Sequence, residues 1–238
     1  MLNFFVSGLE RQTGKTLVTA GIAATMQSLS YQTSVYKPVQ TGAVMMNGFK
    51  SSPDITLIKR IDPNIYVSSS YILKGVDSPF VSAYEDGLNI DINTVISEYR
   101  SICEMTDCNI VEGSNSISSP ISQNFTELDM AKALNLPVLL VVNPKMTPID
   151  NAISALKYIT SEDIKLLGIL VNQYDEASEN LEEKYYPQIL KEFFEVKVLG
   201  TLPDYKNISS LTPETLISDV LNNIDIEGIF GLKISKLS

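Results

Sequence analysis

The feature that most constrains the fold is a repeated alternation of short apolar runs with longer amphipathic segments along the 238-residue chain. Runs rich in Val, Ile and Leu that are separated by helical patterns are typical of parallel strands covered by helices on both faces. We therefore predict one α/β domain over residues 1–238 with a mostly parallel sheet, and the pattern leaves the strand order open. The predicted strands are residues 2–7, 33–39, 108–113, 137–143, 164–173 and 196–203.

Amphipathic patterns and capping residues predict the helices between these strands. Ser78 is a candidate N-cap, Pro79 suits the first helical position and Gly87 marks a stop. Residues 41–52 carry no such pattern, so we predict a loop there. The other helices are predicted at residues 15–29, 54–59, 92–106, 126–134, 148–159, 179–194 and 212–223.

The C-terminal segment, residues 226–238, is too apolar for a free end. It either covers the sheet or joins a dimer contact, and the sequence leaves both readings open. The apolar residues concerned are Ile226, Ile229, Phe230, Leu232 and Ile234.

Charge, apolar content and cysteine usage argue against several classes of protein. The net charge is −10, which does not suit a nucleic-acid partner because that binding depends on neutralising phosphates. No apolar run approaches about 18 residues, so we expect no membrane span, and the N-terminus lacks the basic stretch of a secretory signal. Cys103 and Cys108 are too few for a disulfide framework or a paired zinc site, which fits a reducing cytoplasm.

The absence of histidine restricts the chemistry further. The chain contains no His, which removes Ser-His-Asp and Cys-His nucleophilic systems and every metal site that needs imidazole. Any reaction must use carboxylates, lysines, hydroxyls, backbone amides and an oxygen-binding cation such as Mg²⁺. Phosphoryl transfer suits this set because it needs positioning and charge neutralisation more than a protein nucleophile.

The segment SGLERQTGKT, residues 7–16, is close to a phosphate-binding loop. The usual pattern has four residues between its first glycine and Gly-Lys-Ser/Thr, and this chain has five. A strand before the segment and a helix after it give the context in which backbone amides and a lysine bind phosphate. The alternative is a glycine turn with a solvated lysine. The candidate nucleotide-binding residues of the loop are Gly8, Glu10, Arg11, Gln12, Thr13, Gly14, Lys15 and Thr16.

Three charged residues lie at or beyond the ends of other predicted strands, where ligands of α/β sheets gather. Lys37 follows the apolar residues of the second strand, which we expect to stop at Pro38. A second cation there suits a substrate with two anionic groups; the alternative is an edge lysine. Glu112 ends a strand, and Asp54 begins a short helix, where the helix dipole alone could favour an acid. With Thr16, the two acids offer the oxygen ligands that Mg²⁺ prefers.

Taken in order, these segments resemble the dethiobiotin synthetase family, whose phosphate loop also has five residues between the glycines. The resemblance covers residues 1–205 and implies a P-loop NTPase-like three-layer sandwich. The matching pieces are YKPVQTG (36–42), Asp54, SPFVSAYEDG (78–87), VEG (111–113), LPVLLVVN (136–143), ILVNQ (169–173) and LGTLP (199–203).

The resemblance implies an ATP- and Mg²⁺-dependent ligase of biotin biosynthesis. Such enzymes convert 7,8-diaminononanoate, CO₂ and ATP to dethiobiotin, ADP and phosphate. A carbamate on one substrate amine is phosphorylated, and the neighbouring amine then displaces phosphate. The family is a homodimer in which the partner chain holds part of the substrate.

The resemblance also implies a role for each matching residue at the phosphate end. Lys15 would bind the ATP phosphates, and Thr16 would bind Mg²⁺ together with Asp54 and Glu112. Lys37 would hold the carbamate and the transferred phosphoryl group. Lys15 and Lys37 are therefore the predicted catalytic residues.

Other matching residues would hold the base and the substrate. Asn172 would hydrogen-bond the adenine edge, and its alternative is a turn cap at a strand end. Leu202 and Pro203 would flank the base, and Thr41 would line the substrate pocket. Residues 145–152 match the segment that reaches across the dimer.

The chain departs from the family on the substrate side. Leu9, Glu10 and Arg11 replace a Thr-Asp-Thr or Thr-Asn-Thr sequence, so a bulky cation stands where the family has a small hydroxyl. The family sequence EGAGG becomes EGSNS (112–116), with Asn115 and Ser116 replacing residues that allow close backbone approach.

Two further departures lie in the cross-dimer segment. Thr147 stands where glycine is common, and Asp150 where asparagine is. An acid at position 150 would repel a substrate carboxylate, which Arg11 would offset by binding that carboxylate in another pose. Two alternatives therefore stay open: a related ligase of the cobyrinate amide type, and a nucleotide-sensing domain without catalysis.

Overall fold

The computed structural model describes residues 2–46, 48–193, 196–231 and 233. Its core is a seven-stranded sheet in the order β13-β12-β11-β1-β8-β2-β6. Every neighbouring pair in that sheet is parallel, which confirms the predicted class. The strands are β1 (Leu2–Gly8), β2 (Thr33–Tyr36), β6 (Tyr66–Ser68), β8 (Cys108–Glu112), β11 (Val138–Val142), β12 (Leu166–Tyr174) and β13 (Val198–Pro203).

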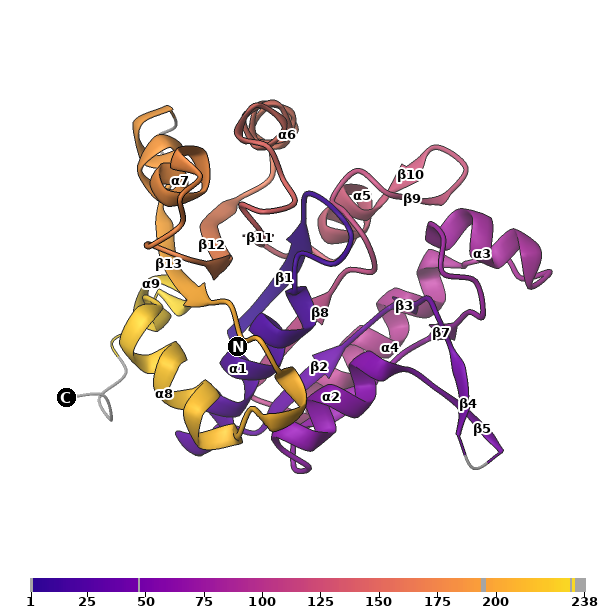
Figure 1. The fold of residues 1–238 in the computed structure, drawn as a ribbon. Helices are drawn as coiled ribbons and strands as arrows, with labels where there is room; N and C mark the ends of the chain where they lie inside the picture. Colours follow the sequence, from indigo (N-terminus) through magenta and orange to yellow (C-terminus); the bar gives the residue numbers. More distant parts are fainter. Residues whose placement is uncertain (1, 47, 194–195, 232, 234–238) are drawn as a thin grey trace.

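Helices cover both faces of the sheet, as Figure 1 shows, and form the predicted three layers. Successive residues of a strand point to opposite faces, so Phe4 and Val6 enter one core and Phe5 enters the other. The first core contains α1 (Lys15–Ser28), α2 (Pro53–Ile61), α8 (Pro213–Asn223) and α9 (Ile226–Phe230). The second contains α3 (Pro79–Glu85), α4 (Ile92–Met105), α5 (Glu127–Ala133), α6 (Ile149–Ser161) and α7 (Leu181–Phe193).

Several short strands differ from the sequence prediction. The predicted loop at residues 41–52 is wrong, because β4 (Val44–Met46) and β5 (Phe49–Ser51) form an antiparallel hairpin there. The second strand, which was predicted to stop at Pro38, ends at Tyr36 as β2, and Pro38 itself has no N–H for a sheet ladder. After Pro38, β3 (Val39–Gln40) pairs with β7 (Tyr71–Ile72). A second hairpin joins β9 (Pro120–Ser122) to β10 (Phe125–Thr126), and a 3₁₀ turn spans Ile208–Ser210.

The described part of the C-terminal segment covers the sheet. Ile226 and Ile229 of α9 are buried in the first core, and the Phe230 ring packs edge-on against Phe4 with centroids 5.5 Å apart. Leu232 and Ile234 lie outside the described residues. Within the described ranges, every helix is too short or too polar to cross a bilayer. The single-domain assignment stays a prediction.

Candidate functional site

The sheet topology brings three strand ends to one edge. β1 lies between β11 and β8, and β8 lies between β1 and β2. In the register of these strands, Val6 lies opposite Glu112, and Tyr36 lies opposite Val111. The phosphate loop after β1, Lys37 after β2 and Glu112 at the end of β8 therefore emerge side by side.

The backbone of the phosphate loop is held in an unusual conformation. Gln12 has a φ of 59° and Gly14 a φ of 82°, both in the left-handed region. At Gly14 a Cβ would also come within 2.0 Å of Asn172 Nδ2, so only glycine fits. Gly14 is the N-cap of α1 and has no side chain to cap the first amides. Those amides are consequently available to an anion.

Lys15 is folded into the site rather than solvated, since its exposed fraction is 5%. Its ammonium donates to the carbonyls of Glu10, at 3.3 Å, and Asn115. Burial lowers the pKa of Lys15, and the carboxylates of Glu127 and Glu112 offset only part of that shift. The lysine is thus preorganised beside the loop amides, with carbonyl partners that an arriving phosphate would replace.

Lys37 is almost fully buried between two carboxylates. Its exposed fraction is 1%, and its Nζ lies 2.7 Å from both Asp54 Oδ2 and Glu112 Oε1. Burial acts to lower the pKa of Lys37, but the two carboxylates outweigh it and the pKa is raised. Burial likewise acts against the charged form of Asp54, yet Lys37 holds the pKa of that carboxyl below its usual value. Lys37 is therefore a charged, paired group and not an edge lysine.

Asp54 does not cap its own helix. The N-cap of α2 is Ser52, whose hydroxyl accepts from the Ile55 N–H at 3.1 Å. The Asp54 carboxylate instead accepts from Lys37 and, at 3.2 Å, from Gln40 Nε2. The side chain is therefore committed to the site and not to the helix terminus.

The oxygens beside Lys37 suit a hard cation. Thr16 Oγ1 donates to Glu112 Oε1 at 2.7 Å, and the other carboxylate oxygen, Oε2, is buried without a hydrogen-bond partner. Together with Asp54, these groups supply oxygen ligands only. In the described part of the chain no cluster of three Cys, His, Asp or Glu side chains could hold a metal by itself. Mg²⁺ often takes only one or two protein carboxylates and completes its shell with phosphate and water.

The residues predicted to contact the adenine base, Asn172, Leu202 and Pro203, have different environments. Asn172 is buried, and its Nδ2 donates to the Thr13 carbonyl at 2.8 Å while Oδ1 has no partner. The Leu202 side chain lies in the core, and Pro203 is exposed. A cavity of about 370 Å³ at the ends of β12 and β13 is lined by Tyr174, Asp175, Glu176, Thr201, Pro203 and Asn223.

The predicted substrate residues Arg11, Thr41, Thr147 and Asp150 each have a different environment. Arg11 donates to the Val76 carbonyl at 2.8 Å, and its guanidinium lies 3.7 Å from Asp77. Thr147 is fully buried and its Oγ1 has no partner, whereas Asp150 is exposed in the first turn of α6. Thr41 is half-buried after β3. Among the described residues, no hydrogen bond or ion pair joins any two of these four predicted residues.

Sequence reasoning missed two residues that contact the site. Gln40 is 4% exposed and reaches Asp54, and it lies within the YKPVQTG segment that was already noted. Glu127 is fully buried, and its carboxylate accepts from Ser7 and from the backbone of Ser114 and Asn115. Burial raises the pKa of Glu127, and Lys15 offsets part of the shift. The contact with Ser7 spans 120 positions, so no local pattern reveals it.

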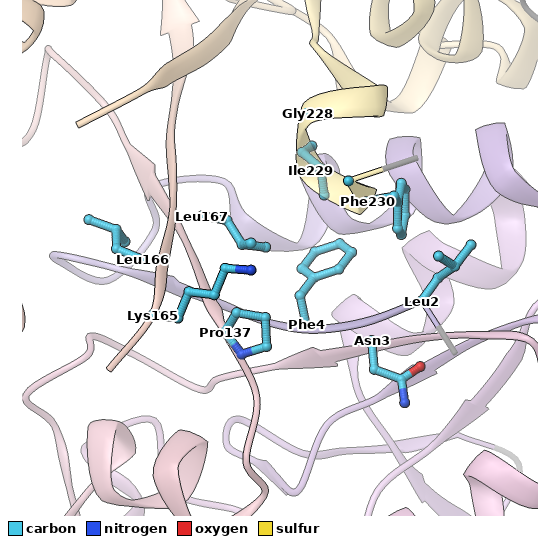
Figure 2. A pocket seen from close by; sticks show the side chains of 11 residues that line it. Leu2, Asn3, Phe4, Pro137, Lys165, Leu166, Leu167, Gly228, Ile229 and Phe230 are labelled. Carbon is cyan, nitrogen blue, oxygen red and sulfur yellow. The ribbon is translucent and has the colours of Figure 1, made fainter. Parts of the chain in front are cut away.

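A separate cavity of about 240 Å³ lies at the opposite edge of the sheet (Figure 2). It is formed by the starts of β1 and β12 and by α9, and the rings of Phe4 and Phe230, which pack edge-on against each other, lie in its lining. Among the described residues that line it, Lys165 is the one that carries a charge. The described lining therefore differs from the phosphate loop, where lysines lie beside carboxylates.

Comparisons with known proteins agree with this geometry. The model of a family described as an AAA domain matches residues 3–215. The ATP-dependent dethiobiotin synthetase BioD of Bacillus subtilis (strain 168) is 27% identical over 225 residues, covering 93% of this chain and 96% of the relative. BioD of Bacillus velezensis is 26% identical and covers 98% of both chains. The cell division ATPase MinD of Pyrococcus furiosus shares the fold, with a TM-score of 0.57, 17% identity and coverage of 98% and 100%.

Proposed function

The chain belongs to the AAA domain family, and from that premise we propose that it is an ATP-dependent dethiobiotin synthetase, a ligase of biotin biosynthesis that forms carbon–nitrogen bonds. The observation that carries the proposal is Lys37, buried between Asp54 and Glu112 beside the phosphate loop. Relatives that are described as ATP-dependent dethiobiotin synthetases match nearly the full chain, which also supports the proposal.

The phosphate loop would bind the triphosphate of ATP. Backbone amides at the start of α1 point toward an anion, and Lys15 would exchange its carbonyl partners for phosphate oxygens. The cavity beside Pro203 and Tyr174 is our candidate for the base, with Asn172 behind it holding the Thr13 carbonyl.

Thr16, Asp54 and Glu112 would hold Mg²⁺. The unpartnered Glu112 Oε2 supports this assignment, because a buried carboxylate oxygen needs a compensating charge or donor. When bound, the cation would neutralise charge on the β- and γ-phosphates.

The reaction needs no nucleophile from the protein. One substrate amine adds to CO₂ and loses a proton to give a carbamate, whose oxygen attacks the γ-phosphorus while ADP leaves. The second amine then attacks the carbonyl carbon, the carbon–oxygen bond to phosphate breaks, and the amine loses a proton as the ring closes. Lys37, charged and desolvated, would hold the carbamate oxygen and the transferred phosphoryl group in both steps.

The substrate half of the proposal depends on a second copy of the chain. Among the described residues no hydrogen bond joins Thr41, Thr147 and Asp150 to one another, and Asp150 is exposed at the start of α6. We propose a homodimer in which residues 145–152 reach the partner's site. Arg11 would meet the substrate carboxylate after releasing the Val76 carbonyl. A cytoplasmic location completes the proposal, since biotin precursors and ATP are available there.

The test is to incubate the protein with ATP, Mg²⁺, bicarbonate and diaminononanoate and to measure the ring product by mass. We expect product from the wild type and from the control variant Lys50→Ala, and about a hundred- to a thousandfold slower product formation by Lys37→Ala. ATP hydrolysis that only another acid or amine stimulates would favour the related amide ligase. Nucleotide binding without turnover on any substrate would favour a sensing domain.

A further inference from the structure

Glu127 is a buried carboxylate that the proposed reaction does not use. It is the first residue of α5, and none of its surface is exposed. Its Oε1 accepts from the Ser7 hydroxyl, and its Oε2 accepts from the N–H groups of Ser114 and Asn115 at 2.9 and 3.2 Å. The donors belong to the end of β1 and to the loop after β8, so this carboxylate connects two parts of the nucleotide site.

Helix capping does not account for this arrangement. Thr126 and Asp129 already form a capping box on α5: the Thr126 hydroxyl accepts from the Asp129 N–H, and the Asp129 carboxylate accepts from the Thr126 N–H. Burying a further carboxylate costs free energy unless its hydrogen bonds are satisfied. The bonds that satisfy Glu127 all go to the site and none to its helix.

The loop that Glu127 holds, residues 113–116, reaches Lys15. The Asn115 N–H donates to Glu127, and the Asn115 carbonyl accepts from the Lys15 ammonium. The same loop begins directly after Glu112. A movement of this loop would therefore shift the contact that orients Lys15 and the backbone next to the proposed metal ligand.

Gly113 provides independent evidence of how closely Glu127 is packed. A Cβ at this position would lie 2.0 Å from Glu127 Oε1, 2.3 Å from Cδ and 2.8 Å from Oε2, and these are its three nearest atoms. Gly113 is not among the residues with a positive φ, so its backbone conformation also suits alanine. The obstacle to a side chain at Gly113 is thus the Glu127 carboxylate.

We infer that Glu127 is a positioning residue, which holds loop 113–116 against β1 and thereby sets where Lys15 meets the phosphates of ATP. The inference rests on the proposed function. The effect depends on hydrogen bonds, so a glutamine should retain it: the amide oxygen accepts from both loop N–H groups, and the amide nitrogen donates to the Ser7 hydroxyl.

The test measures the affinity of the protein for ADP with Mg²⁺ by calorimetry. We expect Glu127→Ala to weaken binding at least about tenfold, and Glu127→Gln to stay within about threefold of the wild type. Gly113→Ala should weaken binding in the wild type and add little in the Glu127→Ala background, because both changes act on one contact. In turnover, Glu127→Ala should raise the KM for ATP and leave the KM for diaminononanoate unchanged.

Asp129→Ala is the matched control on the same helix. It removes the capping box, so it should lower the Tm and leave ADP affinity unchanged. Wild-type affinity in a folded Glu127→Ala protein would overturn the inference, as would an equal loss in Asp129→Ala. If Glu127→Ala does not fold, wild-type affinity in Gly113→Ala overturns it instead. A wild-type protein that binds neither ADP nor ATP would contradict the proposed function itself.

Discussion

The phosphate end and the substrate end of the candidate site differ in how far one chain assembles them. At the phosphate end, Lys37 contacts Asp54 and Glu112, and Glu112 contacts Thr16, all through 2.7 Å hydrogen bonds. At the substrate end, Arg11 is 46% exposed in its side chain and faces Val76 and Asp77. In the first group Lys37 and Glu112 are buried and the side chains are hydrogen-bonded to one another. In the part of the chain that the structure describes, no hydrogen bond or ion pair joins the predicted substrate residues Arg11, Thr41, Thr147 and Asp150 to one another.

This difference follows from the fold. The carboxyl ends of β1, β2 and β8 meet at one edge, so residues after those strands converge without any partner. Asp150 lies at the exposed start of α6, and a second chain is what would bring it to a substrate. Under our proposal, one chain therefore supplies the residues for phosphate chemistry, whereas substrate recognition needs a second copy.

The largest expected effect is that of Lys37→Ala. We expect kcat to fall about a hundred- to a thousandfold, because a charged donor to the transferred phosphoryl group is lost. The variant also leaves Glu112 buried without its cation, which should reduce the free energy of unfolding by about 3–5 kcal/mol. Single-turnover kinetics and denaturant unfolding measure the two effects. Lys50→Ala is the control, and equal kcat values for the two variants would contradict the role of Lys37.

Glu112→Gln should have the next largest effect. It retains the shape of the side chain but removes the charge that faces Thr16 and Lys37. We expect the Mg²⁺ concentration for half-maximal activity to rise about tenfold or more, which corresponds to about 1.4 kcal/mol of lost binding free energy. A Mg²⁺ titration at saturating ATP measures it. An unchanged Mg²⁺ requirement would remove Glu112 from the metal site.

Arg11→Thr examines the substrate end. We expect the KM for diaminononanoate to rise about fivefold, since one partly exposed charge is lost, while the KM for ATP stays within about twofold. Initial-rate measurements in which each substrate is varied in turn give the KM for diaminononanoate and the KM for ATP separately. If only the KM for ATP changes, Arg11 belongs to the phosphate end.

Asp150→Asn should act in the opposite direction and more weakly. Removing the acid should lower the KM for diaminononanoate about twofold at low salt, because repulsion of the substrate carboxylate is relieved and salt screens that repulsion. The comparison of KM at two ionic strengths is the measurement. A rise in KM would mean that Asp150 binds the substrate directly.

The substitution Asp204→Asn should have the smallest effect, and that effect is on the stability of the fold. Hydrogen bonds from Lys145 and Lys206 hold the pKa of this carboxyl below its usual value. A lowered folded pKa gives stability that is present at neutral pH and lost as the pH falls below about 3.9. Asp204→Asn should therefore lower the free energy of unfolding by about 0.5 kcal/mol at pH 7. The difference between the variant and the wild type should disappear in acid. Urea unfolding from pH 7 to pH 3 measures it, and a gap that persists at pH 3 would exclude this ion pair as its cause.

The sequence predicted the main strands and the phosphate end because both have local signals. Apolar runs mark β1, β8, β11 and β12, and Lys37 and Glu112 immediately follow or end such runs. Three-residue strands such as β4 and β6 carry too few residues for a periodic signal, so both were missed.

Contacts between distant parts of the chain could not be predicted in the same way. Glu127 has the sequence context of an ordinary acid in the first turn of a helix, which the dipole favours. Its reach to Ser7 depends on the packing of α5 beside β1, which no pattern near residue 127 encodes. The same holds for Arg11, whose contact with Val76 spans 65 positions.

The most direct test of the central claim follows oxygen from bicarbonate to phosphate. If a carbamate oxygen attacks ATP beside Lys37 and the second amine then breaks the carbon–oxygen bond, ¹⁸O from labelled bicarbonate must appear in the released phosphate. We predict one labelled oxygen per phosphate in a single turnover of the wild type with diaminononanoate, and release of labelled phosphate at least about a hundredfold slower in Lys37→Ala. Ring product accompanied by unlabelled phosphate would contradict the account.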